Sequence, residues 1–200
     1  MTGGALIFIT NLADAGTVLP AACAIPLVLL ACGRRRSALA WLISAGISFA
    51  TILGLKLSFW GCASPSLLAQ VRSPSGHTAS AAVVYGGLAP LLGGDTPVSL
   101  GWSLVVATVV GVSRVQLGMH SVAEVLVGGT IGIMGVALLK MLIGRAVAPA
   151  PASPKLLMLL PLSVIALAAA QQGAHWPVER LIALVARYYW PMHACHVGGS

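Results

Sequence analysis

The sequence predicts an all-α protein, a polytopic membrane bundle of about six helices. Of its 200 residues, 58% are hydrophobic and only 8% are charged, and the mean hydropathy is +0.96. A soluble globular chain carries about 25% charged residues, so this chain has too few polar side chains to cover a water-soluble globule. The composition therefore excludes a cytosolic enzyme, a disordered tail and a nucleic-acid-binding domain. The net charge of +7 then fits basic loops beside anionic headgroups, or an anionic substrate.

The few charged residues divide the chain into apolar segments of the length that a spanning helix needs, about 20 residues. We expect helices at about 16–33, 37–58, 77–93, 97–112, 121–143 and 156–172. Three arginines at 34–36 separate the first two, and a Gly- and Pro-containing turn at 93–97 separates the third from the fourth. A stretch rich in Pro and Ala at 145–155 joins the fifth to the sixth. The segment 3–13 is apolar but short, and we expect it to lie at the interface or to re-enter.

Residues 1–172 are expected to form one membrane domain, and 173–200 a short tail. Within the tail, 177–190 is expected to form a short helix lying on the membrane, because its Trp and Tyr residues are typical of headgroup level.

Loop charge predicts the orientation. The loops 34–36 and 145–155, with Lys140, hold six basic residues. The basic residues of the opposite side are Lys56, Arg72, Arg114, Arg180 and Arg187. Loops rich in basic residues favour the cytoplasm. The excess of basic residues on the first side becomes larger if some cations of the opposite side bind a substrate and are therefore not counted. We therefore expect the loops 58–77 and 113–121 to open together on the outer, periplasmic face of the inner membrane.

These two outer loops carry polar residues of unusual kinds. Residues 72–77 read Arg-Ser-Pro-Ser-Gly-His and run into the third expected helix. Ser75 and Gly76 stand where this helix begins, and a helix N-terminus offers backbone N–H groups that suit a phosphate. Arg72 and Arg114 can bind phosphate oxygens in a bidentate manner.

The second loop holds a histidine and a carboxylate four residues apart, His120 and Glu124. This spacing places them on one helical face, so the carboxylate can fix one ring nitrogen and leave the other as a nucleophile. An ionised acid inside a membrane helix costs about 2.5–3.5 kcal/mol, which makes Glu124 a functional candidate. His77 starts the third helix and faces the same site. Taken singly, each residue is more often an interfacial group or a headgroup anchor; their meeting on one membrane face favours the functional interpretation.

Two segments resemble signature motifs of the type-2 phosphatidic acid phosphatases, a family of membrane lipid phosphate phosphatases. They are Pro-Ser-Gly-His at 74–77 and Ser-Arg-x5-His-x3-Glu at 113–124, and the resemblance covers about residues 56–124. The family's pattern is Lys-x6-Arg-Pro, Pro-Ser-Gly-His and Ser-Arg-x5-His-x3-Asp, on a six-helix layout. Two departures stand out: Glu124 replaces the Asp, and Ala63 and Ser64 occupy the Arg-Pro positions after Lys56.

The resemblance implies that His120 forms a phosphohistidine, that His77 protonates the leaving group and that Glu124 orients His120. The groups implied to hold the phosphoryl oxygens are Lys56, Arg114, Ser75 and the Gly76 amide. For Arg72 two roles stay open: it replaces the missing arginine as a phosphate-binding residue, or it anchors the chain at the lipid headgroups. No metal or other cofactor is expected, because cations and backbone amides stabilise the charge. The expected partners are the bilayer and a lipid substrate, an isoprenoid diphosphate, phosphatidic acid or a similar lipid phosphate.

Three alternatives stay open. A phosphotransferase would pass the phosphoryl group to a lipid or sugar hydroxyl instead of water. A non-catalytic lipid-binding or transport protein would keep the fold without turnover. A membrane serine protease using Ser75 is the least favoured, because the basic residues Lys56, Arg72 and Arg114 would then have no anion to bind.

Overall fold

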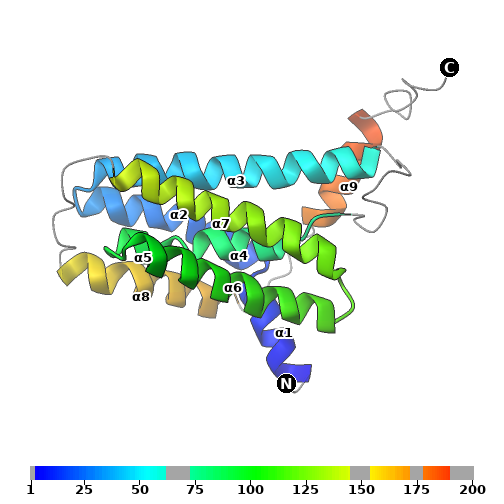
Figure 1. The fold of residues 1–200 in the computed structure, drawn as a ribbon, viewed down its shortest axis with the longest axis horizontal. Helices are drawn as coiled ribbons and strands as arrows, with labels where there is room; N and C mark the ends of the chain where they lie inside the picture. The colour runs from blue at the N-terminus through cyan, green and yellow to red at the C-terminus, as the bar shows by residue number, and fades with distance from the viewer. Residues whose placement is uncertain (1–2, 62–72, 145–153, 172–177, 190–200) are drawn as a thin grey trace.

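The apolar runs of the sequence fold into helices packed side by side (Figure 1). The computed structural model describes residues 3–61, 73–144, 154–171 and 178–189. Its helices are α1 (Gly3–Leu12), α2 (Ala15–Ala31), α3 (Arg35–Gly61), α4 (Gly76–Val84), α5 (Leu88–Leu91), α6 (Thr96–Gln116), α7 (Val122–Gly144), α8 (Pro154–Ala170) and α9 (Val178–Tyr189). No strand occurs in these residues, and the predicted all-α bundle is confirmed.

Four segments of the described chain are long and apolar enough to cross a membrane: Gly3–Ala31, Arg35–Phe59, Thr96–Gln116 and Val122–Gly144. Large apolar side chains are exposed on the outer faces of the long helices, among them Leu27, Leu39, Leu104, Leu126 and Met134. Such a surface suits hydrocarbon rather than water. The chain is therefore a helical membrane protein.

The third expected helix, 77–93, is broken in the structure. It forms α4 and the single turn α5, with a turn at 85–87 between them. Two consecutive glycines, Gly86 and Gly87, occupy this turn, and glycine has low helix propensity. An apolar run alone does not reveal such a break, since the residues on both sides are equally apolar.

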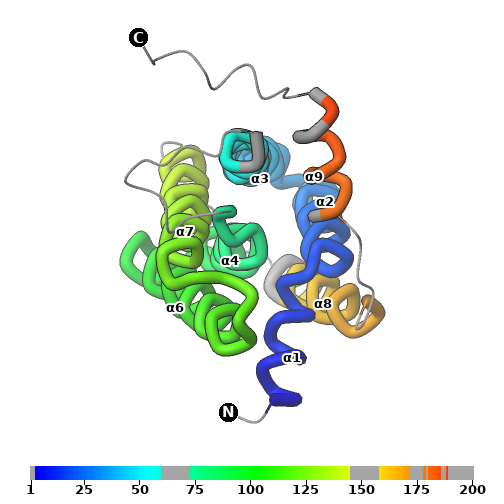
Figure 2. The backbone as a smooth tube through the Cα atoms, turned by 90° about the vertical axis from the view of Figure 1, so that its right-hand side faces the viewer, coloured from blue at the N-terminus to red at the C-terminus, as the bar shows by residue number. Residues whose placement is uncertain are grey.

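The short helix α4 lies at the centre of the bundle. Figure 2 shows it enclosed by α2, α3, α6 and α7, and α4 contacts all four of these helices. Six of its nine residues are buried, most of them Ala or Val. The N-terminus of α4 is thus held in the middle of one end of the bundle.

A stripe of glycines lets α7 approach α4 closely. A Cβ atom on Gly128 would lie 2.3 Å from the Ser75 carbonyl oxygen, and one on Gly132 would lie 2.6 Å from the Ala79 carbonyl oxygen. The four-residue spacing puts both glycines on one face of α7, as in the small-residue packing of membrane helices. This contact fixes α7 against the beginning of α4.

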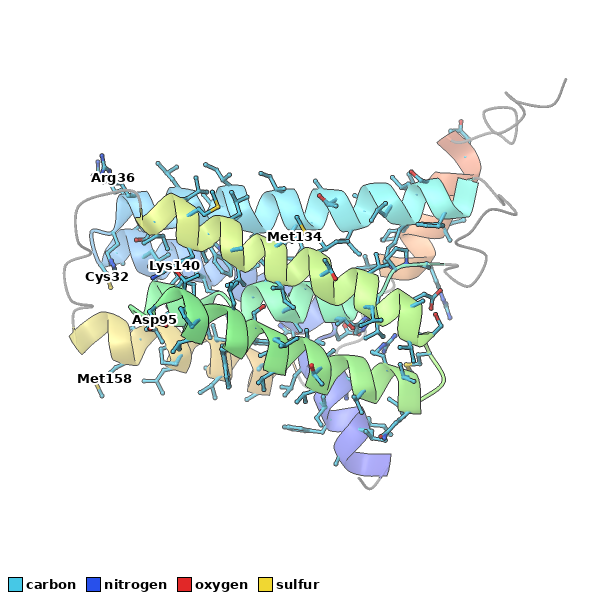
Figure 3. All side chains as sticks on the ribbon, in the orientation of Figure 1. Cys32, Arg36, Asp95, Met134, Lys140 and Met158 are labelled. Carbon is cyan, nitrogen blue, oxygen red and sulfur yellow. The ribbon has the colours of Figure 1, made fainter. Side chains whose placement is uncertain are left out.

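The basic residues near the α2–α3 connection lie at the opposite end of the bundle. Arg34 Nη1 donates to the carbonyl of Leu91 at 3.1 Å, and Lys140 Nζ donates to that of Gly94 at 2.6 Å. Figure 3 shows Arg36 and Lys140 at this end, away from the N-termini of α4 and α7. The structure thus separates the 34–36 loop from the 113–121 loop, as expected.

The remaining helices lie around this core. The short segment expected at 3–13 forms α1, which turns away from α2 at 13–14 and packs on α6. The helix α8 packs on α2, contains Pro161 and has an apolar part, Met158–Ala170, that is shorter than a full span. The helix expected at 177–190 forms α9, which packs on α3 at the same end of the bundle as the N-terminus of α4 (Figures 1 and 2).

Candidate active site

The connection between α6 and α7 is built around one glycine. Gly118 adopts φ +67°, its N–H donates to the Val115 carbonyl at 3.0 Å, and the Met119 N–H donates to the Arg114 carbonyl at 3.0 Å. This pair of bonds is a Schellman motif, which ends a helix and reverses the chain. The residues between Arg114 and His120 therefore form the end of α6 and the turn that follows it. Arg114 lies in the last turn of α6, and His120 lies just before α7.

Ser121 and Glu124 form a capping box at the start of α7. Ser121 Oγ accepts the Glu124 N–H at 3.3 Å, and Glu124 Oε2 accepts the Ser121 N–H at 3.0 Å. The same Oε2 lies 2.9 Å from His120 Nδ1. Because an ionised carboxylate only accepts hydrogen bonds, Nδ1 carries the proton and Nε2 is left with a lone pair.

Burial lowers the pKa of His120, and the hydrogen bond that the ring donates to Glu124 opposes this effect. The positive charges of Arg114 and Lys56 lower it further. The ring is therefore neutral at neutral pH, which is the state that a nucleophile needs. Lys56 from α3 and Arg114 from α6 thus act on the same ring.

Glu124 also joins the two loops. Its Oε1 accepts the Ser73 N–H at 2.8 Å, and its backbone carbonyl accepts the Ser75 N–H at 3.0 Å. On the other side of this loop, Lys56 Nζ donates to Ser73 Oγ at 3.1 Å, and Lys56 is only 2% exposed. A single carboxylate thus fixes both His120 and the chain that leads into α4.

Ser75 is the N-cap of α4 and is fully buried. Its Oγ accepts the Thr78 N–H at 3.4 Å and lies 2.9 Å from Thr78 Oγ1. The Gly76 and His77 N–H groups follow in the first turn, where backbone donors have no acceptor within the helix. These groups can bind an anion, whereas the Ser75 hydroxyl serves as the cap; its contact with phosphate stays a prediction.

Arg114 is held in place by α1. It is 9% exposed, and its Nη1 donates to Thr10 Oγ1 at 3.4 Å. The Thr10 hydroxyl also lies 3.4 Å from that of Ser113. Sequence reasoning did not single out Thr10, because a threonine in an apolar N-terminal segment gives no signal of its own.

Asp14 is a second residue that sequence reasoning missed. It lies at the break between α1 and α2, and its Oδ2 is 3.6 Å from Nε2 of His77. One signal was available: the whole chain has only four acidic residues, and this one stands between two apolar runs.

Of the expected site residues, the structure brings together His77, His120, Glu124, Lys56, Ser75, Gly76 and Arg114. Arg72 lies outside the described residues, as do Ala63 and Ser64, so its role as the replacement arginine stays a prediction. Within the part of the chain that the structure describes, no three His, Cys, Asp or Glu residues cluster as a metal site would require.

Fold and site together define a helical membrane protein in which a carboxylate-held histidine faces cations and a helix N-terminus, an arrangement suited to phosphate esters. The family model described as the PAP2 superfamily matches residues 56–148. This match supports a protein of the type-2 phosphatidic acid phosphatase family, with an activity of the phosphatase or phosphotransferase type on phosphate esters. No curated protein and no solved structure matches the chain significantly. Thr10 and Asp14 lie outside the matched residues.

Proposed function

We propose that the protein is a lipid phosphate phosphatase that hydrolyses a lipid mono- or diphosphate through a phosphohistidine on His120. The observation that carries this proposal is the bond of 2.9 Å from His120 Nδ1 to Glu124 Oε2. It leaves Nε2 as the nucleophilic atom of a partly buried, neutral ring. The cations Lys56 and Arg114 lie near enough to influence this ring.

The proposed reaction has two halves. His120 Nε2 attacks phosphorus, the bond from phosphorus to the leaving oxygen breaks, and His77 gives that oxygen a proton. Water then attacks the phosphohistidine, His77 takes the proton from this water, and the P–N bond breaks to release phosphate. Charge on the equatorial oxygens is stabilised by Lys56, Arg114 and the N–H groups of α4. This mechanism calls for no metal ion.

A cavity beside His77 supports a lipid as the leaving group. Its volume is about 290 Å³, and its polar end holds Asp14, Lys56 and His77. Its apolar walls include Val18, Leu19, Phe49, Ile52, Leu53, Val178 and Ile182, from α2, α3 and α9. Because His77 protonates the leaving oxygen, the group attached to that oxygen would enter this cavity. Apolar walls suit a hydrocarbon chain, as in an isoprenoid diphosphate or phosphatidic acid.

We place the site on the outer face of the inner membrane. The cationic 34–36 loop lies at the other end of the bundle from the N-terminus of α7, which follows His120 in the chain (Figures 1 and 3), and basic loops favour the cytoplasm. Right-side-out membrane vesicles should therefore hydrolyse an added phosphate ester that cannot cross the membrane. Hydrolysis only after the vesicles are permeabilised would place the site inside.

The test of the function is product analysis with the purified protein and a lipid diphosphate. We expect free inorganic phosphate, resistance to EDTA and a phosphoenzyme that survives alkali but not acid. His120→Ala should abolish all turnover, whereas Met119→Ala, at an exposed neighbour, should retain it. A phosphorylated acceptor in place of free phosphate would show a phosphotransferase. Unchanged turnover in membranes carrying His120→Ala would favour a non-catalytic protein.

A further inference from the structure

The acid at the break between α1 and α2 approaches the second histidine of the site. Asp14 Oδ1 accepts the Gly16 N–H at 2.9 Å, which fixes the carboxylate at the N-terminus of α2. Its other oxygen, Oδ2, lies 3.6 Å from His77 Nε2. The two side chains are 15% and 16% exposed, so water screens their interaction only in part.

We propose that Asp14 is a positioning residue for His77, stabilising the protonated ring that gives the leaving group its proton. This inference rests on the proposed function. A carboxylate at this distance favours the charged form of a histidine. With Nε2 on the side of Asp14, Nδ1 is the ring nitrogen that can transfer the proton to the leaving oxygen. The site then holds two histidine–carboxylate pairs with opposite tasks: Glu124 keeps His120 ready to attack, and Asp14 keeps His77 ready to donate.

The other charges around His77 explain why a carboxylate is needed there. Lys56 of α3 lines the same cavity and disfavours a second positive charge on the ring. The carboxylate of Glu124, on α7, is bound to His120 and to the backbone of Ser73. Asp14 is thus the acid that the α1–α2 break brings to His77.

Asp14→Asn separates this role from that of a helix cap. Asparagine caps a helix about as well as aspartate, so α2 keeps its cap and only the charge is lost. The chain offers a matched control in Asp95, the N-cap of α6, which accepts the Val98 N–H at 2.9 Å. Figure 3 shows Asp95 at the opposite end of the bundle from the site. Asp95→Asn therefore makes the same chemical change without touching the reaction.

The measurement is the rate of phosphoenzyme formation with two esters, an alkyl lipid phosphate and p-nitrophenyl phosphate. The nitrophenolate leaves without a proton, whereas an alkoxide needs one. We expect Asp14→Asn to slow the reaction of the alkyl ester about 10- to 100-fold and that of the aryl ester by less than about threefold. Asp95→Asn should match the wild type in every respect.

Two results would overturn the inference: equal slowing of both esters by Asp14→Asn, or rates equal to those of Asp95→Asn. In the His77→Ala background, Asp14→Asn should cause no further loss with the alkyl ester, and a further loss would contradict action through His77. If Asp14→Asn does not fold, Asp14→Ser also preserves a cap and must give the same pattern. Failure of the proposed function is distinguishable, because the wild-type protein would then form no phosphoenzyme at all.

Discussion

Replacing Glu124 by glutamine tests the central arrangement of the site most directly. Among the described residues, three N–H donors converge on this carboxylate. His120 Nδ1 and the Ser121 N–H lie 2.9 Å and 3.0 Å from Oε2, and the Ser73 N–H lies 2.8 Å from Oε1. A carboxylate accepts all three, whereas an amide has one accepting oxygen and one NH₂ group that only donates.

Neither orientation of the amide satisfies the three donors. With its oxygen in the place of Oε2, the NH₂ group faces the Ser73 N–H, and a nearly buried donor is left without an acceptor at a cost of about 1–3 kcal/mol. The ring keeps its tautomer but loses a charged hydrogen-bond partner worth about 1.5–3 kcal/mol, which corresponds to roughly 10- to 150-fold in rate. With the oxygen in the place of Oε1, the NH₂ group faces both Ser121 and His120. The His120 ring must then accept a hydrogen bond at Nδ1 and carry its proton on Nε2, so Nε2 can no longer attack. The equivalent change in a serine protease triad lowers kcat about 10⁴-fold.

We therefore expect Glu124→Gln to lower kcat at least about 10-fold and up to about 10⁴-fold, with a lower midpoint of thermal unfolding. The assays are phosphate release from a lipid phosphate and unfolding in detergent. Glu124→Asp, which restores the acid of the family's motif, keeps an acceptor-only group and should lose less. Asp95→Asn controls for an acid-to-amide change at a helix cap. If Glu124→Gln retains kcat within about threefold of the wild type, the carboxylate does not fix His120 and the mechanism is wrong.

Three further predictions concern packing, protonation and the cavity. A methyl group at Gly128 would lie 2.3 Å from a carbonyl oxygen of the α4 cap, so Gly128→Ala should destabilise the fold by about 1–3 kcal/mol and reduce activity, whereas Gly101→Ala, at an open helical position, should not destabilise it. Burial lowers the pKa of His120, so the free enzyme loses its neutral nucleophile only at acid pH; the acid limb of kcat/KM should have its midpoint below about 6.5, and a midpoint above that value would contradict this role. Ile182→Trp should fill the cavity and exclude about three methylenes of a lipid chain, which is about 2.4 kcal/mol or roughly 50-fold in kcat/KM. The turnover of short-chain phosphates by Ile182→Trp should be unaffected. Leu181 is exposed on the same helix, so Leu181→Trp should leave the turnover of every substrate unchanged. Equal effects of the two variants would refute the proposal that the lipid chain binds in this cavity.

The features that could be predicted from the sequence are those fixed by local geometry. Long apolar runs bounded by charges gave α6 and α7 within four residues of their observed ends, at 97–112 and 121–143 against Thr96–Gln116 and Val122–Gly144. The distance between His120 and Glu124 follows from the pitch of a helix, so the pair could be expected before the fold was known. The break in the third helix could not be predicted from hydropathy, because the residues on both sides of Gly86 and Gly87 are equally apolar.

The contacts that escaped prediction join distant parts of the chain. Thr10 reaches Arg114 across 104 positions, and Asp14 reaches His77 from a segment whose composition is that of any apolar helix. Both depend on the angle at which α1 turns from α2. That angle is set by packing against α6 and not by the residues at the turn alone, so no pattern in 3–14 indicates which partner lies opposite.

The groups that form the site are also the groups that end helices. Ser75 caps α4, Asp14 caps α2, Glu124 closes the capping box of α7, and the Arg114 carbonyl accepts a bond of the Schellman motif that ends α6. Helix ends are where a membrane bundle keeps unpaired backbone donors and bound charges, so they are also where an anion can be held. It follows that truncation to alanine at Ser75, Asp14 or Glu124 removes a cap and a chemical group at once. Only substitutions that keep the cap, such as Asp14→Asn, separate the loss of chemistry from the loss of structure.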